Sequence, residues 1–152
     1  MTDALTQEQL AELSEKHQVY QYQAESIAQQ INMVKLTIKD VENALTTITA
    51  LKDEPAGKET LVPIGFGSFV KATLADPDKV VVGIGAGVSV EKKTDDAKVF
   101  LEKRKDELTK YHEQLNNTIS KLAQELQNIQ KLVQKHQQAI QSQQARQPMR
   151  AQ

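Results

Sequence analysis

The sequence predicts an α+β fold in which a long antiparallel α-helical coiled coil carries two β-hairpins at the junction of its helices. Two regions of about equal length repeat apolar residues every 3.5 positions on average, which is the coiled-coil spacing. The segment between them alternates with period two and is broken by glycine-containing turns, which is typical of short strands. Aromatic residues make up only 4% of the chain, too few for the core of a compact globule of this length.

The first helix is predicted over residues 6–53. Thr6 and Gln9 have the spacing of a capping box, and the segment from Asp53 to Gly57 contains the proline and glycine that end a helix. An apolar seam that is kept over six heptads predicts left-handed supercoiling against a partner helix. Its positions are Leu10, Leu13, His17, Tyr20, Ala24, Ile27, Ile31, Val34, Ile38, Val41, Leu45 and Ile48.

The second helix is predicted over residues 95–143, followed by a flexible glutamine-rich tail over residues 144–152. Thr94 or Asp95 is expected to cap the helix, and Asp96 suits the positive end of its dipole. The seam near Tyr111 has two possible registers, because Tyr111 shares a face with Leu108 and Leu115. The seam positions are Leu101, Lys105, Leu108, His112, Leu115, Ile119, Leu122, Leu126, Ile129, Val133, His136 and Ile140.

Equal lengths predict that the two helices fold back on each other. In that arrangement Ile48 lies near Leu101 and Leu10 lies near Ile140. The first helix opens with acidic residues and the second closes with basic ones, so opposite charges meet at the free end and also suit both helix dipoles. These residues are Glu8, Glu12 and Glu15 in the first helix and Lys131, Lys135 and Arg146 toward the end of the chain.

The centre, residues 58–93, is predicted to form two β-hairpins from strands at 60–66, 69–75, 80–84 and 88–92. Gly65 to Ser68 and Gly85 to Gly87 are read as the hairpin turns, and Pro63 marks an edge strand. Four short strands cannot cover their own apolar faces, so we expect them to join strands of neighbouring subunits. The predicted oligomerisation residues are Leu61, Val62, Ile64, Phe66, Phe69, Val70, Leu74, Val80, Val82, Ile84, Val88 and Val90.

The helix pair then forms an arm with both chain ends at its free tip. Apolar side chains at a frayed tip are expected to bind exposed apolar segments of other proteins. The predicted tip residues are Leu5, Leu10, Leu13, Val133, Ile140 and Met149.

The order of helix, two hairpins and helix resembles the subunit plan of alpha-class prefoldins of the archaeal type. Leu61 to Ile64 resembles the opening strand of that family, and Val82 to Lys92 resembles its glycine-rich motif ending in Val-Glu-Lys. Asp95, Asp96, Ala97 and Phe100 resemble its helix entry. Val88 and Ser89 stand where the family often carries aromatic residues, which leaves a filament-forming paralogue open. The layout covers nearly the whole chain, so residues 1–152 are expected to form a single prefoldin-like domain.

The resemblance implies a molecular chaperone of the holdase kind. Two alpha and four beta prefoldin subunits would form a hexamer on a platform of β-barrels, capture unfolded polypeptides at the arm tips and pass them to a group II chaperonin without ATP. A cytoplasmic protein without cofactor, metal, membrane or nucleic-acid partner is expected. A structural spacer or filament subunit that binds no client, and a scaffold that docks a dedicated partner helix, are the alternatives.

Other chemistry is disfavoured by the sequence. There is no cysteine, and a formal net charge of −1 does not suit phosphate-backbone binding. The glycines at 83, 85 and 87 lack the spacing of a dinucleotide loop. His17 and His136 are expected near each other at the tip, too few ligands for a closed zinc site, although their protonation is expected to weaken the tip. Lys105 is expected to reach outward from the seam, so catalysis is not expected.

Overall fold

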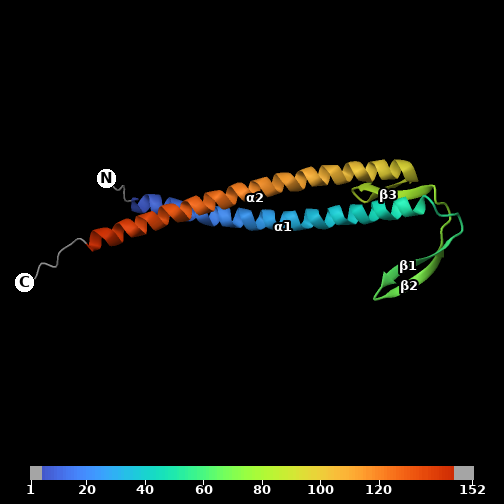
Figure 1. Ribbon diagram of the computed structural model, residues 1–152, viewed down its shortest axis with the longest axis horizontal. Coiled ribbons are helices and arrows are strands. Elements are labelled where there is room, and N and C mark those ends of the chain that lie inside the picture. The colour runs from blue at the N-terminus through green and yellow to red at the C-terminus, as the bar shows by residue number, and fades with distance from the viewer. Residues whose placement is uncertain (1–4, 146–152) are drawn as a thin grey trace, which may run out of the picture. The chain divides into compact units, whose positions relative to one another are not determined.

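The fold is described from a computed structural model, in which residues 5–145 can be described. Its elements in chain order are α1 (Gln7–Leu51), β1 (Glu59–Gly65), β2 (Ser68–Thr73), β3 (Lys79–Gly85), β4 (Val88–Lys93) and α2 (Thr94–Gln144) (Figure 1). Two long helices with two antiparallel hairpins between them confirm the predicted fold class. Within the described residues, neither helix has a stretch long and apolar enough to cross a membrane.

The chain divides into two compact units, each built from parts of both helices. Unit 1 comprises Met1–Met33 and His112–Gln152, and unit 2 comprises Val34–Tyr111. Unit 1 therefore contains the beginning of α1 and the end of α2, whereas unit 2 contains the hairpins. The expectation of a single domain over residues 1–152 stays a prediction.

In unit 1 the beginning of α1 lies antiparallel to the later part of α2 (Figure 1). The predicted capping box is present: the Thr6 amide donates to Gln9 Oε1 over 2.9 Å, and the Gln9 amide donates to Thr6 Oγ1 over 3.2 Å. Just before this cap, the Leu5 amide donates to Nδ1 of His136 over 3.1 Å. We call this end of unit 1 the open end.

The pairing at the open end differs from the prediction that Leu10 lies near Ile140. Leu10 instead borders a groove with Ile129 and Val133, and Ile140 is 39% exposed. The end of α2 continues past the start of α1, as the dark blue and red segments show in Figure 1. The physical reason is that a repeating seam can shift by whole heptads, and the observed offset leaves the last turns of α2 without a facing helix.

The heptad seam is otherwise as predicted. Every predicted seam position of α1 is buried or half-buried, and so is every one of α2 except Ile140. Tyr111 is exposed and His112 half-buried, which settles the two possible registers in favour of His112. The predicted meeting of charges at the open end forms no direct ion pair among the described residues, and Glu12 pairs with Lys16 of its own helix at 3.2 Å.

The two hairpins of unit 2 are copies of one backbone plan, twenty residues apart in sequence. Glu59 pairs with Thr73 as Lys79 pairs with Lys93, and a bulge precedes each turn, at Ile64 and at Ile84. Each turn has two residues with positive φ: Phe66 and Gly67 at 49° and 70°, Ala86 and Gly87 at 51° and 76°. These are the values of a type I′ turn, whose twist suits tightly connected antiparallel strands.

Only one hairpin packs against the helices of its own unit. Val82 of β3 is 7% exposed and forms a small core with Ile48 of α1 and Ala97 of α2. Val80, Phe100 and Leu101 pack against this core. The side chains of β1 are all exposed, and those of β2 are exposed apart from Ala72. The first hairpin therefore lacks an apolar partner within unit 2.

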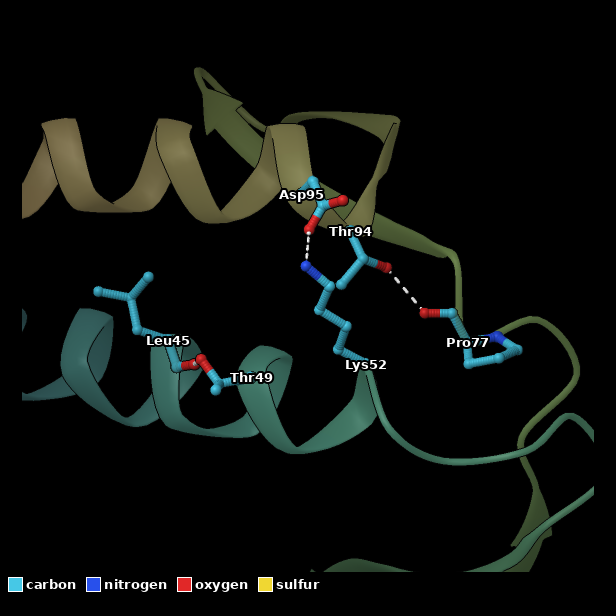
Figure 2. A network of polar contacts seen from close by, with 6 residues as sticks. All are labelled: Leu45, Thr49, Lys52, Pro77, Thr94 and Asp95. Atoms are coloured by element: carbon cyan, nitrogen blue, oxygen red, sulfur yellow. Dashed lines mark hydrogen bonds and ion pairs between the residues drawn. The ribbon is translucent and has the colours of Figure 1, made fainter.

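Polar contacts hold the start of α2 against the 76–78 turn and the end of α1 (Figure 2). Thr94 is buried; its hydroxyl donates to the Pro77 carbonyl and its amide to the Asp78 carbonyl, both over 2.8 Å. Lys52 Nζ lies 2.7 Å from Asp95 Oδ1. The side chains expected to cap α2 thus bind the 76–78 turn and the end of α1 instead.

The Lys52–Asp95 contact shifts the pKa of both side chains. The hydrogen bond and the positive charge of Lys52 lower the pKa of Asp95, and the same contact raises the pKa of Lys52. Both side chains are solvent-exposed, so this pair ties α1 to α2 at the surface of unit 2 rather than in its core.

Candidate functional site

A groove of about 520 Å³ runs along the helix pair at the open end. Its apolar side chains are Leu10 and Leu13 from α1 and Ile129 and Val133 from α2. Ile129 is buried, whereas the other three are half-buried and keep part of their surface in solvent. Because successive seam residues recur every three or four positions, these side chains form one continuous apolar floor.

The rim of this groove consists of polar side chains without fixed charge. They are Ser14, His17, Gln18, Gln21, Gln130 and Gln134. The four glutamines are exposed, and within residues 5–145 their side-chain amides make no hydrogen bond. The site can thus offer apolar contact and amide hydrogen bonds together.

Three of the predicted tip residues meet at this groove. Leu10, Leu13 and Val133 border it, and Leu5 is fixed nearby through the hydrogen bond to His136. Ile140 does not border it, and Met149 lies outside the described residues. Whether these residues bind a substrate stays a prediction.

The sequence reading missed Ile129 and the glutamine rim. Ile129 is predicted as a seam position but not as a tip residue, because the expected pairing places the start of α1 several residues further along α2. A repeating seam carries no local signal for the offset between the helices, so the sequence alone did not reveal it.

His17 and His136 both lie at the open end, where they contact different residues. His17 borders the groove, while Nδ1 of His136 accepts a hydrogen bond from the Leu5 amide. The described residues contain no group of three or more histidine, cysteine, aspartate or glutamate side chains suited to a metal ion. Weakening of the tip at low pH stays a prediction.

Lys105 reaches out of the seam in unit 2. Its Nζ lies 2.9 Å from Glu42 Oε1, and both side chains are partly exposed. The contact is an ion pair between the two helices, and such a partly exposed pair contributes little to folding stability in water.

The second candidate site is the apolar surface of the first hairpin, β1–β2. Its pairs include Val62 opposite Val70 and Pro63 opposite Phe69, on alternate faces, so both faces of the hairpin carry apolar side chains. Phe66 is fully exposed at the turn. This surface contains Leu61, Val62, Ile64, Phe66, Phe69 and Val70, all of them exposed.

The other predicted oligomerisation residues divide into three groups. Ile84 and Val88 are exposed, whereas Leu74, Val80 and Val90 are half-buried. Val82 belongs to the core of unit 2, which leaves little of its side chain for a neighbouring chain. Binding of other subunits by the remaining residues stays a prediction.

Comparison with known proteins assigns the family. The family model described as "Prefoldin subunit" matches residues 20–139. The chain is 46% identical over 96 residues to the prefoldin subunit alpha of Methanosarcina barkeri, covering 61% of this chain and 67% of that protein. It is 41% identical over 85 residues to that of Methanococcoides burtonii, covering 56% and 62%.

A solved structure has the same fold. A chain from the cryo-EM structure of filamentous PFD from Methanocaldococcus jannaschii superposes with a TM-score of 0.66 and 28% identity, covering 76% of this chain and 96% of that one. The sequence match to the family model extends from within α1 to within α2 and includes both hairpins. A chaperone-type role belongs to this family. The chain therefore belongs to the prefoldin family, in its archaeal alpha class.

Proposed function

We propose that this chain is a holdase subunit that captures unfolded polypeptides at the open end and passes them to a group II chaperonin without ATP. The observation that carries the proposal is the groove at the open end, where an apolar floor remains accessible on paired helices. Unfolded chains expose apolar segments, and transferring these from water to such a floor is favourable at about 25 cal/mol per Å².

Assembly is the second part of the proposal. The first hairpin joins strands of beta-class prefoldin subunits in a cytoplasmic hexamer of two alpha and four beta chains. Its apolar residues on both faces support this, since exposed two-sided strands are marginal in water and pair readily with other chains. Several subunits would place several open ends around one client, and linked weak sites bind far more tightly than one.

Protection of a denatured client against aggregation tests the capture step. The full-length chain, assembled with a beta-class subunit, is expected to suppress the light scattering of a denatured protein without ATP. A variant lacking residues 1–13 and 137–152 is expected to assemble and lose most of this protection. Full protection by a truncated assembly of normal mass would refute capture at the open end.

A filament-forming subunit is the second candidate, favoured by the similarity to a filamentous PFD chain. A heterologous contact that does not close into a ring produces filaments. Native mass spectrometry of the chain alone and with a beta-class subunit separates the two: a closed hexamer has one mass, whereas a filament gives a ladder of masses. A ladder that persists with the beta-class subunit present would reject the hexamer.

A further inference from the structure

We infer that the groove at the open end selects extended, uncharged polypeptide segments, with aliphatic side chains on its floor and the segment backbone held by its glutamine rim. This inference rests on the proposed function and specifies the chemistry of the ligand. Its basis is the lining of the groove rather than the general presence of apolar surface.

The lining of the groove carries no fixed charge. The ten side chains that line the groove include no Asp, Glu, Lys or Arg, although 26% of the chain is charged. The neighbouring charges of α1, Glu12 and Lys16, pair with each other on another face of the helix. A charged ligand side chain would lose water in this groove and find no partner, which disfavours acidic and basic segments alike.

The rim of the groove supplies side-chain amides. Gln18 and Gln21 on α1 and Gln130 and Gln134 on α2 border the groove with amides that make no hydrogen bond within residues 5–145. Each amide offers two donors and an acceptor with two lone pairs. A helical ligand satisfies its own backbone, whereas an extended segment presents free N–H and C=O groups that such amides can bind.

The groove has the size of a ligand site. A groove of about 520 Å³ lies within the range of ligand sites in proteins, roughly 300–1,000 Å³. The floor of four aliphatic side chains can therefore take a few ligand side chains. Selection would depend on the local absence of charge and not on a particular sequence.

The test measures peptide binding to the full-length chain by fluorescence anisotropy. Three labelled peptides share a central Leu-Val segment and differ only in flanking residues: serine and asparagine, aspartate, or lysine. The neutral peptide is expected to bind about tenfold more tightly than either charged one. Its affinity is expected to stay constant between about 0.05 and 0.5 M salt, because no ion pair is involved. Methylating the backbone nitrogens of the neutral peptide is expected to weaken binding.

Charge variants make the assignment specific to the groove. Gln18→Glu with Gln130→Glu is expected to weaken the neutral peptide about tenfold and to shift the preference to the lysine-flanked peptide, now with salt dependence. Gln23→Glu with Gln124→Glu makes the same charge change on the same helices outside the groove and is expected to leave all three affinities unchanged.

The outcomes separate this inference from the proposed function. Equal affinity for the three peptides, or equal effects of the two double variants, overturns the inference even if the assembly still protects denatured clients. If the unmodified chain neither binds the peptides nor protects the denatured client, the proposed function itself is overturned. If the double variant Gln18→Glu with Gln130→Glu still protects the client normally, capture takes place outside this groove.

Discussion

The two hairpins of unit 2 have the same backbone plan and opposite environments. Strand pairing, bulge position and turn conformation repeat with a shift of twenty residues. The second hairpin turns Val82 onto Ile48 and Ala97, so one of its faces is covered by the helices of its own unit. The first hairpin leaves Val62, the residue equivalent to Val82, in solvent.

The difference shows that backbone geometry does not decide which hairpin is completed within the chain. The second hairpin presents one apolar face, and the opposite face carries polar residues such as Glu91, which pairs with Lys79 at 3.3 Å. The first hairpin is apolar on both faces. A two-sided apolar hairpin requires two covering layers, which one helix pair does not supply, so its partner is expected to be another chain.

The largest effect is expected from charging the equivalent valines. Val82→Asp places a carboxylate in the small core of unit 2 and is expected to lower the free energy of unfolding by about 3 kcal/mol or more. Val62→Asp is expected to change it by about 1 kcal/mol or less, since that position is exposed and only strand propensity is lost. Denaturant unfolding of the chain alone measures both.

For assembly with the beta-class subunit, the effect of the change at Val62 is expected to be large. Val62→Asp leaves a folded chain that no longer binds the beta-class subunit, as judged by native mass. Similar losses of folding stability for both variants would mean that the first hairpin is covered within its own chain, and the comparison would fail.

The next effect concerns the turn residues Phe66 and Ala86. Phe66→Ala is expected to leave unfolding nearly unchanged, because the ring is fully exposed, but to weaken assembly by about 2 kcal/mol, as for an aromatic anchor at an interface. Ala86→Gly relieves a positive φ and is expected to stabilise the second hairpin by about 1 kcal/mol without altering assembly. Titration with the beta-class subunit and amide exchange of each hairpin separate the two. Unchanged assembly in Phe66→Ala would remove Phe66 from the interface.

A smaller effect is expected at the base of each hairpin. Thr94→Val removes the hydroxyl that binds the Pro77 carbonyl and is expected to destabilise unit 2 by about 1 kcal/mol. At the base of the first hairpin, the Gly57 amide donates to the Leu74 carbonyl over 2.6 Å with φ at 83°. Gly57→Ala strains this turn by about 1 kcal/mol, but the loss is expected only in the amide exchange of the first hairpin. A global loss in Gly57→Ala would show that the two hairpins unfold together.

The elements themselves follow from the sequence, because local signals determine them. Heptad spacing marks both helices, and paired glycines mark both turns at 65–67 and 85–87. What the sequence does not reveal is which of two similar hairpins packs on the helices, since Val62 and Val82 stand in comparable strands. That choice depends on whether the opposite face also needs covering.

The candidate groove was predicted only in part for a similar reason. Leu10, Leu13 and Val133 are recognisable as apolar residues near the chain ends. The contribution of Ile129 depends on the offset between the helices, which a repeating seam leaves free to shift by whole heptads. The glutamine rim carries no pattern of its own, and it becomes a feature only once the two helices are aligned.

The smallest effect is expected from the Lys52–Asp95 pair, which connects the helices beside the second hairpin. Asp95 has a lowered pKa, so its contribution to stability is present above its ordinary value of 3.8 and is lost as the pH falls through the lowered value. Lys52 has a raised pKa, so its contribution is present below 10.5 and is lost as the pH rises through the raised value.

Lys52→Ala is therefore expected to reduce stability slightly between these limits and not in strong acid, with a smaller reduction at high salt. Unfolding of Lys52→Ala, Asp95→Asn and the double variant across pH gives the coupling of the pair. Lys71→Ala, which removes a 3.8 Å contact with Glu59 inside the first hairpin, is the matched control and is expected to leave the stability of the helix junction unchanged. An equal pH dependence in Lys71→Ala would show that the pH dependence does not come from the pair that ties α1 to α2.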